Sequence, residues 1–79
     1  MEEYEATFAI ESKTDAYAVE RLLNRLYDAV REESRKTREV TSDSTGTLSD
    51  FAAVRDAARR HAPGRLTVVY ERREAEFGE

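Results

Sequence analysis

Two segments with strand periodicity lie near opposite ends of this 79-residue chain, and they constrain its fold more than any other feature. From Tyr4 to Glu11, apolar side chains alternate with more polar ones, which is the pattern of a half-buried strand. Residues 66–71 alternate in the same way and are rich in β-branched side chains. Two strands so far apart in sequence can pair only if the intervening chain folds back between them.

The intervening chain predicts a long helix first. Ser12 to Asp15 has the spacing of a capping box, in which a hydroxyl accepts a backbone amide and an acid three residues later reaches back. Apolar residues then recur at steps of three and four, and ion-pair spacings extend the helix to about Thr37. The predicted core stripe of this helix is Ala16, Val19, Leu22, Leu23, Leu26, Tyr27 and Val30.

A second, shorter helix is predicted after a loop. The segment from Arg38 to Thr47 is polar, with Val40 as its single apolar residue, and predicts the loop. A second capping-box spacing at residues 47–50 predicts a helix start, and apolar positions continue to Ala62. Pro63-Gly64 ends that helix, because proline cannot continue the amide ladder and glycine suits a turn.

The predicted order of elements is therefore strand, helix, helix, strand. If each helix packs back across the sheet, the chain reverses at every step and the two strands pair antiparallel. We expect a single domain over residues 1–79 with a two-layer α+β fold, β-α-α-β, whose antiparallel strands pack under a helical hairpin. A third strand at residues 39–42 is the alternative. The charged tail, residues 73–79, is expected to fray.

Such a monomer has little interior. A two-stranded sheet is marginal in water, and below about 80 residues one core seldom supplies more than about 3–5 kcal/mol. Joining sheet edges or helix faces across a two-fold axis satisfies open backbone groups and buries further apolar surface. We therefore expect a homodimer, with the sheet extended by the second copy.

Charge and cysteine content exclude several function classes. Asp and Glu outnumber Lys and Arg by 17 to 13, and this net charge of -4 disfavours a surface that binds nucleic acid or anionic lipid as a whole. The absence of cysteine excludes disulfides, thiol nucleophiles and Cys-ligated metals. The sequence has no transmembrane run and no secretory pattern at Met1-Glu2-Glu3-Tyr4, so we expect a soluble cytoplasmic protein without membrane contact.

The sequence offers little for catalysis. His61 is the sole histidine and has no nucleophile at a recognisable spacing, and one histidine without cysteine does not make a transition-metal site. Residues 41–50 match neither a calcium loop nor a phosphate-binding loop. We therefore predict no catalytic, cofactor-binding or metal-binding residues and a non-enzymatic protein; an enzyme that uses His61 with a carboxylate is the remaining alternative.

Two groups of surface residues are candidates for binding. Guanidinium groups on the second helix and last strand suit phosphate or carboxylate ligands. Equally, they can balance a helix dipole and neighbouring carboxylates. This candidate anion or nucleic-acid patch consists of Arg55, Arg59, Arg60 and Arg65. The polar side of the first helix offers a candidate partner face, since Tyr and Arg are favoured at contact centres. Its residues are Tyr17, Arg21, Asn24 and Asp28.

Residues 4–8, 19–30 and 63–68, together with a bias toward Arg and Glu, resemble a family of small uncharacterised proteins of halophilic archaea. The resemblance implies a salt-rich cytoplasm and carries no activity or site residues. The leading hypothesis is a homodimeric protein-interaction module. The second is a nucleic-acid accessory protein that uses the arginine patch.

Overall fold

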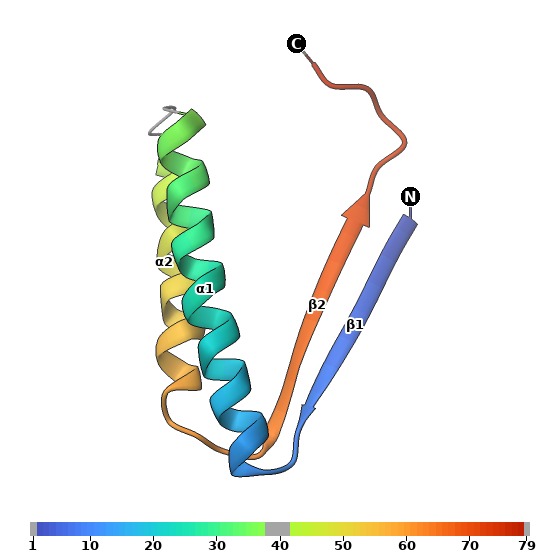
Figure 1. Ribbon diagram of the computed structural model, residues 1–79. Coiled ribbons are helices and arrows are strands. Elements are labelled where there is room, and N and C mark those ends of the chain that lie inside the picture. The colour runs from blue at the N-terminus through green and yellow to red at the C-terminus, as the bar shows by residue number, and fades with distance from the viewer. Residues whose placement is uncertain (1, 38–41, 79) are drawn as a thin grey trace.

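The computed structural model describes residues 2–37 and 42–78 and has the predicted order of elements. Its bounds are Glu2–Ile10 for strand β1, Lys13–Thr37 for helix α1, Ser42–Ala58 for helix α2 and Gly64–Arg72 for strand β2. The strands pair antiparallel in a two-stranded sheet, here called the ribbon, and the helices lie side by side as a hairpin (Figure 1). The predicted α+β class and the strand direction are confirmed.

The predicted capping box sets the start of α1. The backbone N–H of Asp15 donates to Ser12 Oγ at 3.1 Å, and the Asp15 carboxylate accepts from the backbone N–H of Glu11 at 2.9 Å. The backbone N–H of Ala16 then donates to the Ser12 carbonyl at 3.0 Å. Amides that the helix leaves unpaired at its start are satisfied in this way, so the chain turns sharply from β1 into α1.

Helix α2 starts earlier than predicted. It begins at Ser42, so the expectation of a loop through Thr47 is wrong. The polar residues at this start have low helix propensity, and packing of α2 along α1 overrides such propensities. The alternative third strand at residues 39–42 lies outside the described residues except for Ser42, which is helical.

Helix α2 also ends earlier than predicted, at Ala58 rather than Ala62. The backbone N–H groups of Arg59 and Arg60 donate to carbonyls three residues back, at 3.2 and 3.1 Å, which tightens the last turn. Pro63 disfavours the helical conformation in the residue before it. The chain bends at Pro63, and β2 begins at Gly64, so the predicted turn residue Gly64 is the first residue of the strand.

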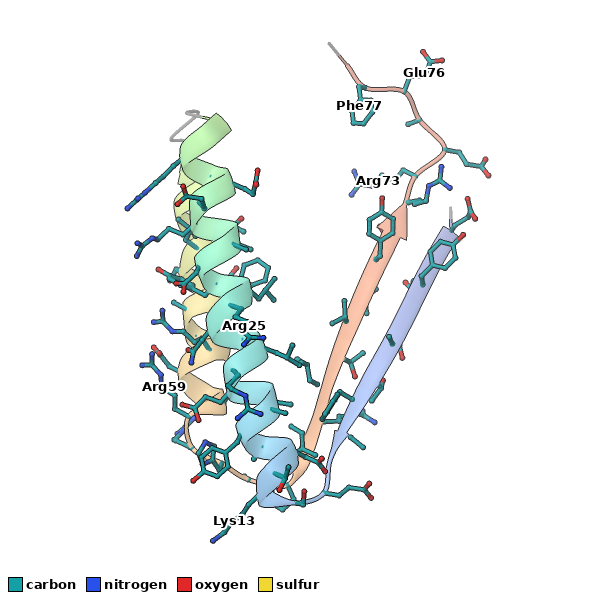
Figure 2. All side chains as sticks on the ribbon, in the orientation of Figure 1. Lys13, Arg25, Arg59, Arg73, Glu76 and Phe77 are labelled. Atoms are coloured by element: carbon teal, nitrogen blue, oxygen red, sulfur yellow. The ribbon has the colours of Figure 1, made fainter. Side chains whose placement is uncertain are left out.

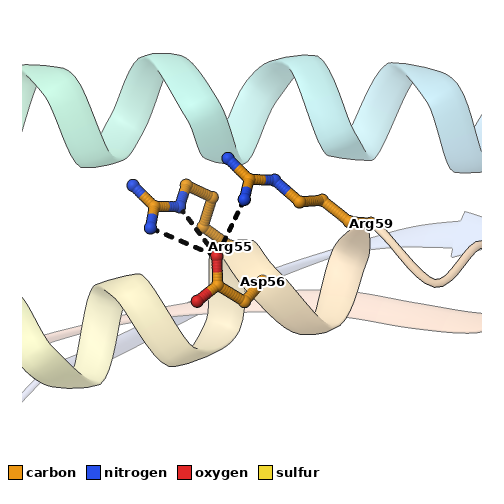
Figure 3. A network of polar contacts seen from close by, with 3 residues as sticks. All are labelled: Arg55, Asp56 and Arg59. Carbon is orange, nitrogen blue, oxygen red and sulfur yellow. Dashed lines mark hydrogen bonds and ion pairs between the residues drawn. The ribbon is translucent and has the colours of Figure 1, made fainter.

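Arg55 joins the two helices. Its guanidinium carbon lies 4.2 Å from the centre of the Tyr27 ring on α1. Its Nε and Nη2 lie 3.2 and 3.1 Å from Asp56 Oδ1 (Figure 3). Arg59 Nη1 contacts the same oxygen at 3.2 Å, but the Arg59 side chain is 53% exposed against 22% for Arg55. Arg55 therefore makes a partly desolvated cation–π contact across the hairpin.

The ribbon and the helical hairpin meet at one end and diverge toward the other, as the two arms of a V (Figure 1). We call the closed end the apex; it contains the connections at residues 10–16 and 58–66. The Cα radius of gyration is 14.9 Å. A compact chain of this length has a value of about 11.6 Å. The excess reflects arms that are not packed along their length.

The buried core lies at the apex. Among the described residues, the buried apolar side chains are Ala16, Val19 and Leu23, all on α1. Ile10 and Leu66 approach them from the strands and are half-buried. No large side chain in the described ranges is fully buried.

Residues 73–78 follow β2 without helix or strand, beyond the open end of the ribbon. This tail carries Arg73, Glu76 and Phe77 (Figure 2), and Phe77 is 90% exposed. Neither helix, as far as residues 13–37 and 42–58 show, combines the length and apolar character of a membrane span.

Arg55→Ala is expected to lower the free energy of unfolding by about 1 kcal/mol, because it removes the cation–π contact and the packing of the arginine stem. Arg59→Ala takes a more exposed guanidinium from the same carboxylate and should cost less than about 0.5 kcal/mol. Urea unfolding followed by circular dichroism, at one protein concentration, measures both. Equal losses would contradict the cross-helix role of Arg55.

Candidate interaction surface

The ribbon has one apolar and one polar face, as the predicted alternation requires. Residues directly opposite each other in an antiparallel pair share a face. The apolar pairs are Tyr4 with Tyr70, Ala6 with Val68, and Phe8 with Leu66. The other face carries Glu3 with Glu71, Glu5 with Val69, Thr7 with Thr67, and Ala9 with Arg65. The hydroxyls of Thr7 and Thr67 lie 3.2 Å apart.

The apolar face of the ribbon turns toward the helices at the apex. There Ile10 and Leu66 line a hollow together with Val19 and Leu23 of α1 and Val54 of α2. Farther from the apex the two arms separate (Figure 1), and the same face of the ribbon is open.

The helices continue the apolar stripe beyond the apex as well. Leu22 and Leu26 follow the buried Val19 at helical steps of three and seven, which places them on the same side of α1. Their side chains are 45% and 40% exposed, and Val54 of α2 is 46% exposed. The predicted core stripe of α1 is thus present, but only its apex end is covered.

These exposed apolar side chains, on the apolar face of the ribbon and on the helices, are here called the wedge surface. Each member is between 39% and 63% exposed. Its residues are Tyr4, Phe8, Val68 and Tyr70 of the ribbon and Leu22, Leu26 and Val54 of the helices. Leu22 and Leu26 were predicted to belong to the core stripe of α1, and the structure leaves both exposed.

At the open end of the ribbon, polar contacts hold Tyr4. Its hydroxyl donates to Glu2 Oε2 at 2.6 Å, and Arg72 Nη1 donates to Glu2 Oε1 at 3.2 Å. The hydrogen bond to Glu2 raises the pKa of the Tyr4 phenol. Tyr4 therefore stays neutral at physiological pH, and its ring is available to an apolar contact.

A polar cluster lies on α1 and the segment after α2. His61 Nε2 lies 2.5 Å from Glu20 Oε1, and the two side chains are 28% and 27% exposed. The Tyr17 ring stands edge-on to the His61 ring, with centroids 4.4 Å apart and an interplanar angle of 60°. The histidine and the glutamate are 41 residues apart in sequence, so no local spacing pointed to their contact.

The candidate partner face follows one side of α1, as its spacing requires. Tyr17 is 49% exposed and contacts His61. Arg21 and Asp28 are exposed, and Asn24 is half-buried. This row does not include the leucines of the wedge surface, so the largest exposed apolar area of α1 lies elsewhere. The partner face stays a prediction.

The four residues of the candidate anion patch fall into two groups. Arg55 and Arg59 share the carboxylate of Asp56, and Arg59 projects on the side of the hairpin away from the ribbon (Figure 2). Arg60 and Arg65 lie at the apex, beside the apolar hollow. The structure therefore does not gather four unpaired guanidinium groups on one surface.

Within the described ranges, no three His, Asp or Glu side chains converge as metal ligands. Comparison of the chain with protein families, curated proteins and solved structures finds no match. The proposals below therefore depend on the geometry of the chain itself.

His61→Ala is expected to lower the free energy of unfolding by about 1 kcal/mol, because it removes both the Glu20 hydrogen bond and the Tyr17 ring contact. Arg60→Ala, at the exposed neighbouring position, should change it by less than about 0.5 kcal/mol. Urea unfolding at a fixed protein concentration makes the comparison. If the free energy of unfolding of the His61→Ala variant equals that of the wild type, the cluster does not stabilise the contact between α1 and the segment after α2.

Proposed function

We propose that this protein is a non-enzymatic interaction module whose working form is a homodimer. The observation that supports the proposal is the wedge surface: an apolar face shared by both arms and left uncovered within one chain. Contiguous apolar surface of this kind, framed by charged residues, is typical of protein contact sites.

The amount of exposed surface supports a large interface. The chain exposes 6802 Å². A compact monomer of 9.1 kDa exposes about 4,900 Å² by the usual scaling of area with mass. The excess of about 1,900 Å² on each chain corresponds to about 3,800 Å² for a symmetric pair, within the range of obligate homodimers.

A second copy of this chain fits the wedge surface better than a partner of other chemistry. Each copy offers an apolar ribbon face and an apolar helix face, and the ribbon of one copy supplies what the helices of the other leave uncovered. A two-fold axis makes this exchange reciprocal, so both copies lose their exposed apolar side chains in one step. The pair then presents its polar outer faces to further protein partners.

The enzyme alternative requires a carboxylate beside His61, and Glu20 is in that position. The two side chains are hydrogen-bonded to each other. Glu20 occupies His61 Nε2, and the Tyr17 ring stands against the imidazole. With Nε2 bonded to Glu20, only Nδ1 could act as a general base, and among the described residues no hydroxyl or other nucleophile contacts it. A structural tie between α1 and the segment after α2 accounts for the contacts without any reaction.

The contacts of Asp56 with Arg55 and Arg59 count against the nucleic-acid alternative. This carboxylate takes up the charge of Arg55 and Arg59, which reduces the positive potential of the helix. Phosphate binding depends on guanidinium charge that can replace counterions. The wedge surface therefore supports assembly with protein more strongly than the arginines support binding to nucleic acid.

The mass of the wild-type protein at micromolar concentration is expected to be about 18 kDa by light scattering, twice the chain mass of 9.1 kDa. Val68→Lys places an ammonium group on the apolar face of the ribbon and should raise the dimer dissociation constant at least about tenfold. Val69→Lys is the matched control, because Val69 is similarly exposed, at 53% against 57%, but lies on the polar face.

A wild-type mass near 9 kDa would refute the homodimer. Equal weakening by the two lysine variants would show that the apolar face of the ribbon is not the one in contact. Because the same substitution is made at adjacent strand positions, a general loss of strand propensity affects both variants alike.

We further propose that the protein works in the cytoplasm of a salt-loving archaeon, in line with its acidic, arginine-rich surface. Dimerisation should then tighten as KCl rises from about 0.1 M to about 2 M, because salt screens repulsion between two chains that each carry a charge of -4. Sedimentation equilibrium across this range measures the dissociation constant. Steep weakening with salt would instead indicate an interface dominated by ion pairs.

A further inference from the structure

The ribbon has two free edges, and they differ in charge. The strand order β1-β2 leaves the outer edge of each strand unpaired. All charged residues of β1 are acidic: Glu2, Glu3 and Glu5. Strand β2 carries both signs, with Arg65 near its start and Glu71 near its end. An edge of mixed sign can pair with a second copy of itself, whereas an edge of one sign repels its copy.

The two edges also differ in position. In Figure 1, β2 is the strand nearer the helical hairpin, and β1 lies on the outer side of the ribbon. A strand added to β2 therefore lies on the helix side of the ribbon, whereas a strand added to β1 lies on the side away from the helices. Pairing at the β2 edge therefore satisfies open backbone groups and brings the second copy nearer to the helices than pairing at β1 does.

Resting on the proposed homodimer, we propose that two copies pair their β2 edges antiparallel around a two-fold axis at Val68, giving a four-stranded sheet in which β2 strands are central and β1 strands are outermost. In this register Arg65 lies opposite Glu71 of the second copy, and the pair occurs twice. Leu66 lies opposite Tyr70 of the second copy on the apolar face.

Neighbouring registers lose this complementarity. A two-fold axis at Val69 sets Arg65 opposite Arg73, and an axis at Thr67 sets Arg65 opposite Val69. Among the ion pairs within the described ranges, none involves Arg65, and the Glu71 carboxylate has only a 4.0 Å contact with Arg73. Both members of the proposed cross-copy pair are therefore available to it.

The same arrangement ends assembly at two copies. Pairing uses both β2 edges, so the edges that remain belong to the β1 strands with their glutamates. Like charges on an exposed edge discourage further strand addition. A closed dimer results instead of an extending sheet.

Single-cysteine cross-linking tests the seam directly, because the chain contains no cysteine of its own. Val68→Cys places two thiols opposite each other at the axis, where Cα atoms in paired strands are about 4.5–5.5 Å apart and a disulfide can form. Ala6→Cys is the control: Ala6 is the cross-strand neighbour of Val68 on β1. In the proposed dimer, the Cα atoms of position 6 in the two copies are three strand spacings apart, about 14 Å, which is too far for a disulfide.

Under mild oxidation we expect the Val68→Cys protein to convert mostly to a covalent dimer on a non-reducing gel and the Ala6→Cys protein to remain monomeric. Cross-linking of Ala6→Cys instead would place the seam at β1. If neither variant cross-links while the wild-type mass is that of a dimer, the edge pairing is wrong and the homodimer stands. A monomeric wild type overturns both.

A charge exchange provides the second test. Arg65→Glu brings acidic side chains together twice at the seam and should raise the dissociation constant at least about tenfold at low salt. Glu71→Arg should do the same with opposite sign. The double variant R65E/E71R restores opposite charges and should return the constant to within about threefold of wild type. If the effects of the two substitutions on the dissociation constant add in the double variant, the proposed register is wrong.

Discussion

Apolar contact between the two arms is confined to the apex, and the rest of the structure depends on that confinement. Val19 and Leu23 of α1 line a hollow there together with Ile10 and Leu66 of the strands, in a molecule that measures 46 × 28 × 16 Å overall. Most backbone hydrogen-bonding groups are satisfied, because the helices bond their own amides and the two ribbon strands pair with each other. One chain therefore leaves apolar side chains exposed and the outer edges of both strands unpaired.

The apex also fixes the relation of the arms. The connection from β1 to α1 is short and is pinned by the hydrogen bonds of Ser12 and Asp15. The return from α2 to β2 is tied to α1 through His61 and Glu20. These polar contacts join the elements at the apex, and the proposed dimer depends on the arrangement of the arms that they hold.

Patterns of period two and three to four predicted the elements, because they report which side of a strand or helix is apolar. They gave the faces of the ribbon and the capping box at Ser12 correctly. They do not report whether an apolar side is covered, so Leu22 and Leu26 were assigned to a core stripe that the structure leaves partly exposed. The start of α2 was missed because packing overrode propensity, and the contact of His61 with Glu20 was beyond any local pattern.

Closure of the V onto itself is the competing way to bury the wedge surface. It would require the ribbon to swing about the apex, where the hydrogen bond between Glu11 and Asp15 holds the connection from β1 to α1. It would also leave the β2 edge unpaired, with Arg65 and Glu71 at opposite ends of one strand and unable to meet. In the proposed dimer, a second copy on the β2 edge would keep the apex contacts and supply the missing strand partners. The proposed pairing would therefore satisfy more unmet groups than closure of the V, without breaking the apex contacts.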